Sequence, residues 1–219
     1  MPIKAIVADD HPLFRLALKQ AIIGILGDEI LEADSFQASL DLLAKHADVE
    51  LVFLDIKMPG NAGLTGLTTL RSQYPDILVL IVSAEENPNL VRKAIDFGAS
   101  AYIPKSTPLP EIAAAIRDVL EGKIWLPNDI SQQVSNMANL ADQAFANKLA
   151  QLTPHQYKVL QMLAEGLLNK QIAYELQVSE STIKQHVSAV LHKLALNNRT
   201  QAGVLFKECL GNTDEAASD

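Results

Sequence analysis

Short apolar runs alternate with longer amphipathic stretches through the first half of the chain. Four of these runs have the length of a buried strand and lie at 3–7, 51–54, 77–82 and 101–103. A fifth run, at 29–33, predicts a strand between the first two. Because the runs are almost continuously apolar, they predict strands of a parallel sheet that is covered on both faces.

The stretches between the runs carry apolar residues at helical spacing. The first begins just after Pro12, and others follow at 35–46, 63–73, 88–97 and 108–120. Ser35 and Thr107 are suited to cap the amino ends of two of these helices. Five strand–helix units in succession predict an α/β domain with a five-stranded, parallel, doubly wound sheet.

Polar side chains stand where four of the strands end. Asp9 and Asp10 follow the first strand, Asp55 the third, Ser83 the fourth and Lys105 the fifth. The carboxyl ends of parallel strands meet at one edge of a sheet, where such folds bind their ligands. Three carboxylates together need a cation, and Mg²⁺ prefers hard oxygen ligands. Any one of these residues suits an ordinary loop, but the ordered set favours a phosphoryl site.

The residues around these positions are recognisable as a motif set. They are ADDHPLFR at 8–15, LDIKMPG at 54–60, VSA at 82–84 and GASAYIPK at 98–105. The set resembles the receiver domain of two-component response regulators, a flavodoxin-like fold, over 1–122. The resemblance implies that Asp55 accepts a phosphoryl group from a sensor histidine kinase. It implies Mg²⁺ as cofactor, bound by Asp10, Asp55 and the main-chain carbonyl of Lys57, with Asp9 acting through water.

The same resemblance assigns a conformational switch to Ser83 and Tyr102, and a phosphoryl contact to Lys105. Taken alone, Tyr102 is typical of an ordinary strand aromatic. The chain departs from many receivers at one point, because Ser106 follows Lys105 where they have a proline after a cis peptide bond. A cis bond before serine costs about 3 kcal/mol, so the sequence leaves the geometry of this bond open.

The chain changes character after Gly122. Residues 123–149 are polar with few charges and predict an interdomain linker that is partly helical, around 141–150. Thr153 and Pro154 then predict a helix start. A short helix at 169–176, a turn at 177–178 and a longer helix from Ser179 to about Ala195 predict an all-α helix-turn-helix domain over 150–211. An acidic tail, 212–219, is expected to be disordered.

The longer of these helices has a polar face that is not acidic. Its apolar stripe consists of Ile183, Val187, Val190, Leu191 and Leu194. The opposite face consists of Thr182, Lys184, Gln185, Ser188 and His192. Such groups can reach base edges or phosphates in a major groove, although an ordinary solvated helix face has the same pattern.

The surrounding motifs are LTP at 152–154, LAEGLLNKQIA at 163–173, VSESTIKQH at 178–186 and KLALNNRTQA at 193–202. They resemble the four-helix DNA-binding domain of the LuxR/NarL/FixJ family. The resemblance assigns base reading to Lys184, Gln185 and Ser188, and backbone contacts to Asn169, Thr182 and Lys193. It also makes the last helix, 200–210, a dimer surface that includes Val204. Gln177 stands where this family usually has glycine.

Composition agrees with two domains of different roles. The net charge is −8, yet the block 151–209 holds six basic and four acidic residues and no aspartate. The single cysteine, Cys209, excludes an intrachain disulfide, and no run has the length of a membrane span. We therefore expect a cytoplasmic protein with no membrane partner.

These features predict a DNA-binding response regulator, not an enzyme, that dimerises on paired DNA half-sites when Asp55 is phosphorylated. Two alternatives stay open. The chain could bind DNA independently of phosphorylation and use its receiver only to dimerise. It could also be an aspartyl-nucleophile phosphatase, but such enzymes need a second acid two residues after the nucleophile, and Lys57 occupies that position.

Overall fold

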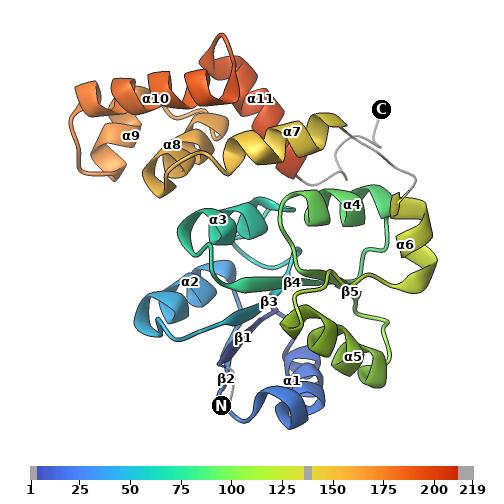
Figure 1. The fold of residues 1–219 in the computed structure, drawn as a ribbon. Coiled ribbons are helices and arrows are strands. Elements are labelled where there is room, and N and C mark those ends of the chain that lie inside the picture. The colour runs from blue at the N-terminus through green and yellow to red at the C-terminus, as the bar shows by residue number, and fades with distance from the viewer. Residues whose placement is uncertain (1–3, 136–139, 212–219) are drawn as a thin grey trace. The chain divides into compact units, whose positions relative to one another are not determined.

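The computed structural model describes residues 4–135 and 140–211, and the chain divides into two compact units, Met1–Asn139 and Leu140–Asp219. The first unit alternates strands and helices (Figure 1). In order, they are β1 (Ala5–Ala8), α1 (Pro12–Leu26), β2 (Ile30–Ala33), α2 (Phe36–Lys45), β3 (Leu51–Asp55), α3 (Thr65–Gln73), β4 (Leu78–Ser83), α4 (Pro88–Asp96), β5 (Ala101–Pro104), α5 (Leu109–Leu120) and α6 (Asn128–Ser135).

The five strands form one parallel sheet in the order β2-β1-β3-β4-β5. The order reverses direction after β1, which creates a crevice between the carboxyl ends of β1 and β3. The register pairs Ala8 with Leu54 and Asp55 with Val82, so the residues that follow β1 lie beside the end of β3. The predicted α/β fold is confirmed.

Helices cover both faces of this sheet. Figure 1 shows α1 and α5 on one face and α3 and α4 on the other. Leu18 and Ile22 of α1 and Ile116 of α5 are buried against Val7 and Phe53 of the sheet. Burial of each such side chain contributes about 1.5–3 kcal/mol to the free energy of folding. This packing holds the strands, and therefore their ends, in fixed positions.

The two predicted helix caps have different outcomes. Ser35 caps α2, because its Oγ accepts a hydrogen bond from the Ala38 amide at 3.3 Å. Thr107 does not cap α5, since that helix begins at Leu109 and its N-cap position is Pro108. The two prolines at 108 and 110 set the backbone there and move the helix start beyond the threonine.

The segment after α5 first follows the sheet edge and then forms a helix. Trp125 bridges to Ala101 in parallel orientation, and its carbonyl accepts a hydrogen bond from the Tyr102 amide at 3.2 Å. Helix α6 then packs against α4 with Ile130 and Val134 buried. The carbonyl of Val134 accepts a hydrogen bond from Arg92 at 3.3 Å. This helix was not predicted, because its other positions are polar and its apolar stripe is short.

The second unit is entirely helical. Its elements are α7 (Leu140–Leu149), α8 (Pro154–Ala164), α9 (Asn169–Glu175), α10 (Glu180–Leu194) and α11 (Arg199–Leu210). Thr153 and Gln156 form a capping box at α8, and Ser179 caps α10. Val159, Ile172 and Ile183 join α8, α9 and α10 in one apolar cluster. The predicted helix-turn-helix, α9 and α10, is confirmed.

Helix α7 lies within the predicted linker but packs with the second unit. Phe145 and Leu149 are buried, and the Lys148 ammonium donates to the Leu194 carbonyl at the end of α10 at 3.0 Å. A cation at this place also complements the negative end of the α10 dipole. The amino-terminal part of the linker therefore packs on the first unit through α6, and α7 packs on the second.

Backbone geometry explains two turns in the second unit. Gln177, between α9 and α10, has φ of 53°, and Ala195, at the end of α10, has φ of 55°. Both lie in the left-handed region that favours glycine.

Within the described residues, no helix combines the length and apolar composition that crossing a membrane requires. The expected disorder of 212–219 concerns residues outside those that the structure describes.

Candidate functional site

Three carboxylates gather at the carboxyl ends of β1 and β3. Asp9 and Asp55 are almost fully buried, with 1% and 2% of their surface exposed, while Asp10 is partly exposed. The parallel pairing of β1 with β3 brings the three together from positions far apart in sequence. Buried carboxylates repel each other and require compensating charge.

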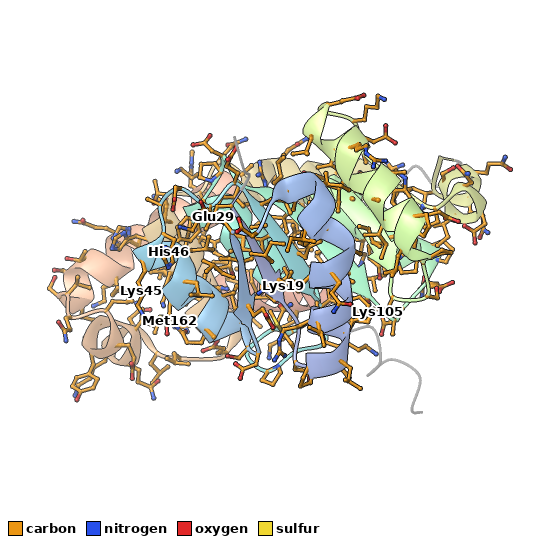
Figure 2. The ribbon with its side chains drawn as sticks, turned by 90° about the horizontal axis from the view of Figure 1, so that it is seen from below. Lys19, Glu29, Lys45, His46, Lys105 and Met162 are labelled. Carbon is orange, nitrogen blue, oxygen red and sulfur yellow. The ribbon has the colours of Figure 1, made fainter. Side chains whose placement is uncertain are left out.

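Lys105 supplies part of that charge. Its Nζ lies 2.7 Å from Asp55 Oδ2 and 2.7 Å from Asp9 Oδ2, and 5.0 Å from the centre of the Phe14 ring. Figure 2 labels Lys105 beside α1. Burial alone would lower the pKa of Lys105, but the two carboxylates outweigh it and hold that pKa above its ordinary value. Lys105 is therefore a fixed cation at the acidic site. Its bond to Ser106 is trans, since the described residues contain no cis peptide.

One lysine leaves the cluster with excess negative charge. Ligand atoms from Asp9, Asp10, His11 and Asp55 all lie within 4.8 Å of one another. Asp9 Oδ2 and Asp10 Oδ1 are buried without an aligned hydrogen-bond donor, even though Lys105 and His11 lie nearby. An ammonium close to a carboxylate oxygen but without hydrogen-bond geometry neutralises charge and does not satisfy the oxygen lone pairs. The residues present therefore fit a divalent cation such as Mg²⁺.

The loop after Asp55 is held in place by its own hydrogen bonds. The Lys57 amide donates to Asp55 Oδ1 at 3.0 Å. Asn61 Nδ2 donates to the Asp55 carbonyl at 3.0 Å, and its Oδ1 accepts from the Gly66 amide at 2.8 Å. This loop fixes the Asp55 carboxylate and keeps the Lys57 backbone next to it. The Lys57 ammonium forms an ion pair with Glu85, across the site.

Ser83, at the end of β4, and Tyr102, within β5, are both fully buried. They share one partner, Glu85. The Ser83 hydroxyl oxygen accepts a hydrogen bond from the Glu85 amide at 3.1 Å, and the Tyr102 hydroxyl donates to the Glu85 carbonyl at 2.8 Å. The Lys105 amide donates to the Ser83 carbonyl at 2.7 Å, which ties the two strand ends together.

The exposed face of α10 carries most of the predicted DNA-binding residues. Lys184, Gln185 and Ser188 are exposed, and Lys184 pairs with Glu180 at 3.0 Å along the helix. Thr182 is half-buried, with its hydroxyl 2.8 Å from that of Ser179. The buried side of the helix consists of Ile183, Val190 and Leu194, with Val187 and Leu191 half-buried, as its apolar stripe predicts.

The remaining predicted contacts have partners inside the second unit. Lys193 is half-buried, and its ammonium donates to the Gln151 carbonyl at 2.9 Å and to Gln156 Oε1 at 2.7 Å. It thus braces α10 against the start of α8. The Asn169 side-chain oxygen accepts from Arg199 at 3.5 Å. Val204, on α11, is 49% exposed.

Three residues near the acidic site were not singled out by the sequence. Glu85 lies in a loop and acts through its main chain, which leaves no pattern in the sequence. Asn61 holds the Asp55 loop by its side chain. The sequence signal for it was its position directly after the motif LDIKMPG. His11 stands directly after the aspartate pair, and that adjacency was the signal available.

Comparison with known families agrees with this geometry. Residues 5–117 match the response regulator receiver domain. Residues 150–206 match the bacterial regulatory proteins of the luxR family. The first match covers the whole acidic site and the second covers α8 to α10 and most of α11.

Similar proteins span nearly the full chain. The glycerol metabolism activator of Pseudomonas putida is 44% identical over 204 residues, which cover 91% of this chain and 92% of that protein. The nitrate/nitrite response regulator NarL of Escherichia coli is 30% identical over 208 residues, which cover 93% and 94%. The solved structure of the RcsB response regulator of Salmonella typhimurium has the same fold, with a TM-score of 0.58 at 21% identity over 94% of this chain and 98% of that one. The chain therefore belongs to the response regulators that join a receiver domain to a LuxR-type DNA-binding domain and regulate transcription.

Proposed function

We propose that Asp55 is the phosphoacceptor through which a sensor histidine kinase controls this regulator. The observation that carries the proposal is the position of the Asp55 carboxylate, buried at the end of β3 with Lys105 Nζ 2.7 Å from Oδ2. Asp55 Oδ attacks the phosphorus of a phosphohistidine, the P–N bond breaks, and the histidine nitrogen leaves with the electron pair. The product on this chain is an acyl phosphate.

The surrounding residues serve this transfer. Asp10, Asp55 and the main-chain carbonyl of Lys57 would hold Mg²⁺ directly, and Asp9 would act through a water. When bound, the cation neutralises charge on the phosphoryl oxygens. Lys105 pairs with a phosphoryl oxygen in place of part of its contact with Asp55.

Ser83 and Tyr102 transmit the change to the surface. The Ser83 hydroxyl leaves the Glu85 amide and donates to a phosphoryl oxygen. Tyr102 then repacks, which changes the surface formed by α4, β5 and α5. The phosphorylated protein thereby favours one of two receiver conformations, as expected of a population shift.

The second unit delivers the response to DNA. Lys184, Gln185 and Ser188 read base edges in the major groove, while Asn169, Thr182 and Lys193 contact the DNA backbone. Dimers form through the α11 surface that includes Val204, which places two recognition helices on paired half-sites. A role in DNA binding supports a cytoplasmic location for the protein.

The functional regions we propose are a receiver at 1–122, a linker at 123–149, a DNA-binding domain at 150–211 and an acidic tail at 212–219. The two family matches, at 5–117 and 150–206, lie inside the first and third regions and support this division.

Phosphoryl incorporation tests the first step directly. The purified protein is incubated with Mg²⁺ and a small acyl phosphate, and the mass of the intact chain is measured. We expect the mass of one phosphoryl group on the wild type and none on Asp55→Asn. Asp48→Asn, which changes an exposed aspartate elsewhere in the receiver, serves as the matched control and should still be modified. Equal modification of Asp55→Asn would assign the phosphoryl group to another residue.

A further inference from the structure

His11 lies at the mouth of the acidic site. It follows the aspartate pair, at the N-cap position of α1, and 65% of its side chain is exposed. Its Nδ1 is 2.7 Å from Asp10 Oδ1 and 3.1 Å from Asp9 Oδ1. The His11 amide also donates to Asp9 Oδ1 at 2.8 Å, which fixes the backbone and directs the ring toward the cluster.

The distance from His11 Nδ1 to Asp10 Oδ1 suits two atoms that share a cation. Ligands bind an octahedral Mg²⁺ at about 2.0–2.1 Å, so neighbouring ligand atoms lie about 3 Å apart. The 2.7 Å separation of His11 Nδ1 from Asp10 Oδ1 is close to that value. The nitrogen thus has the spacing of a direct ligand beside Asp10, while Asp9 acts through water.

A simple ion pair explains the contact with Asp10 less well. Asp10 Oδ1 is buried without an aligned hydrogen-bond donor, although His11 Nδ1 is 2.7 Å away. The ring nitrogen Nδ1 is instead within hydrogen-bond distance of Asp9 Oδ1, at 3.1 Å, and of Lys105 Nζ, at 3.5 Å. Asp10 Oδ1 therefore keeps lone pairs that a cation can bind.

We propose that His11 adds a nitrogen ligand to the metal site and shifts its preference toward cations that accept imidazole, such as Mn²⁺, over Mg²⁺. The proposal rests on the metal site of the proposed function. A set of oxygen ligands suits Mg²⁺. Imidazole nitrogen binds transition metals more strongly than it binds Mg²⁺, and its affinity rises from Mn²⁺ through Fe²⁺ and Co²⁺ to Ni²⁺. The exposed ring can reach the cation without moving any buried side chain.

Separate titrations with Mg²⁺ and Mn²⁺ test this at one fixed, neutral pH. Wild type, His11→Asn and the control His46→Asn are compared by calorimetry. Their Mn²⁺ complexes are then examined by electron spin-echo spectroscopy, which detects a coordinated imidazole nitrogen. His46 is a half-buried histidine at the end of α2 and makes no contact with the cluster in the described structure.

We expect His11→Asn to weaken Mn²⁺ binding about tenfold, to leave Mg²⁺ binding nearly unchanged and to remove the nitrogen signal. His46→Asn should match the wild type in all three measurements. Equal effects of His11→Asn on both metals, or an echo signal without nitrogen in the wild type, would overturn the role of His11 alone. Failure of the wild type to bind either metal would overturn the metal site itself, together with this inference.

Discussion

The Tyr102 hydroxyl donates a hydrogen bond to the main-chain carbonyl of Glu85 at 2.8 Å. The amide of the same Glu85 donates to the Ser83 hydroxyl oxygen at 3.1 Å, and its carboxylate pairs with Lys57. One loop residue thus connects the buried tyrosine, the buried serine and the loop after the proposed phosphoacceptor. A Ser83 hydroxyl that moves toward Asp55 would lose its contact with Glu85, the residue that also accepts the Tyr102 hydrogen bond.

Removal of the tyrosine hydroxyl should destabilise the resting receiver. Tyr102→Phe leaves the Glu85 carbonyl without this donor, so we expect a loss of about 1 kcal/mol in the free energy of unfolding. The measurement is urea unfolding of the full chain. Tyr174→Phe is the control, because Tyr174 is 82% exposed and its hydroxyl is free to bind water. Equal stabilities of Tyr102→Phe and wild type would contradict the importance of this bond.

Alkaline pH should act through the same residue. Burial holds the pKa of Tyr102 above its ordinary value of 10.0, and the nearby carboxylates of Glu85, Asp55 and Glu86 add to this although the Ser83 hydrogen bond opposes it. The unfolded chain then loses its Tyr102 proton at lower pH than the folded one. Stability contributed by the neutral tyrosine is complete below pH 10 and declines as the pH rises above it.

Unfolding free energies measured from pH 8 to pH 11 test this expectation. The wild type should lose stability above about pH 10 more steeply than Tyr102→Phe, which has no proton to lose at this position. Parallel pH profiles for the two proteins would show that Tyr102 ionises with the same pKa in both states.

The fold could be predicted because its signals are local and repeated. Apolar runs marked all five strands, and the parallel sheet then followed from the strand–helix alternation. Helix α6 was not predicted, because Ile130 and Val134 are the buried apolar residues among its described side chains. An apolar stripe that short resembles a polar linker. The Thr107 cap failed because two following prolines moved the start of α5 to Leu109.

The left-handed turn at Gln177 stores strain that the sequence already indicated. The sequence resemblance places Gln177 where the LuxR/NarL/FixJ family usually has glycine, and its φ is 53°. We expect Gln177→Gly to raise the free energy of unfolding by up to about 1 kcal/mol, because glycine adopts this conformation without a steric penalty. Thermal unfolding measures the change. Lys158→Gly, in the exposed middle of α8, should instead lower stability, and a loss from both substitutions would contradict the strain.

Two lysines of α10 should differ in how their loss affects the protein. Lys193 donates to Gln151 and Gln156, whereas Lys184 is exposed and pairs only along its own helix with Glu180. We therefore expect Lys193→Ala to lower the unfolding free energy by about 1 kcal/mol as well as to weaken DNA binding. Lys184→Ala should weaken DNA binding without measurable loss of stability, because an exposed pair contributes little.

Thermal unfolding and DNA binding at several salt concentrations separate these effects. If Lys193 contacts a phosphate, its removal should also reduce the salt dependence of binding by about one counterion. An unchanged melting temperature for Lys193→Ala would show that its contacts to α8 do not stabilise the second unit.

The sequence predicted the residues of the candidate site only where the side chain itself takes part in the site. The ends of the strands identified Asp9, Asp10, Asp55 and Lys105, since parallel strands bring those positions to one edge. The role of Glu85 could not be predicted, because its amide and carbonyl make contacts that any residue at that position could make. Pairwise contacts such as Lys193 with Gln156 depend on packing between α8 and α10, which spacing along one helix does not specify.

The central claim is that phosphorylation of Asp55 controls DNA binding. The most direct measurement is the affinity of the purified protein for promoter DNA, by fluorescence anisotropy with Mg²⁺, with and without a small acyl phosphate. The account predicts that the phosphodonor tightens binding by the wild type about tenfold and leaves Asp55→Asn unchanged. The same affinity for wild type and Asp55→Asn under both conditions would contradict it and would indicate a regulator that binds DNA independently of phosphorylation.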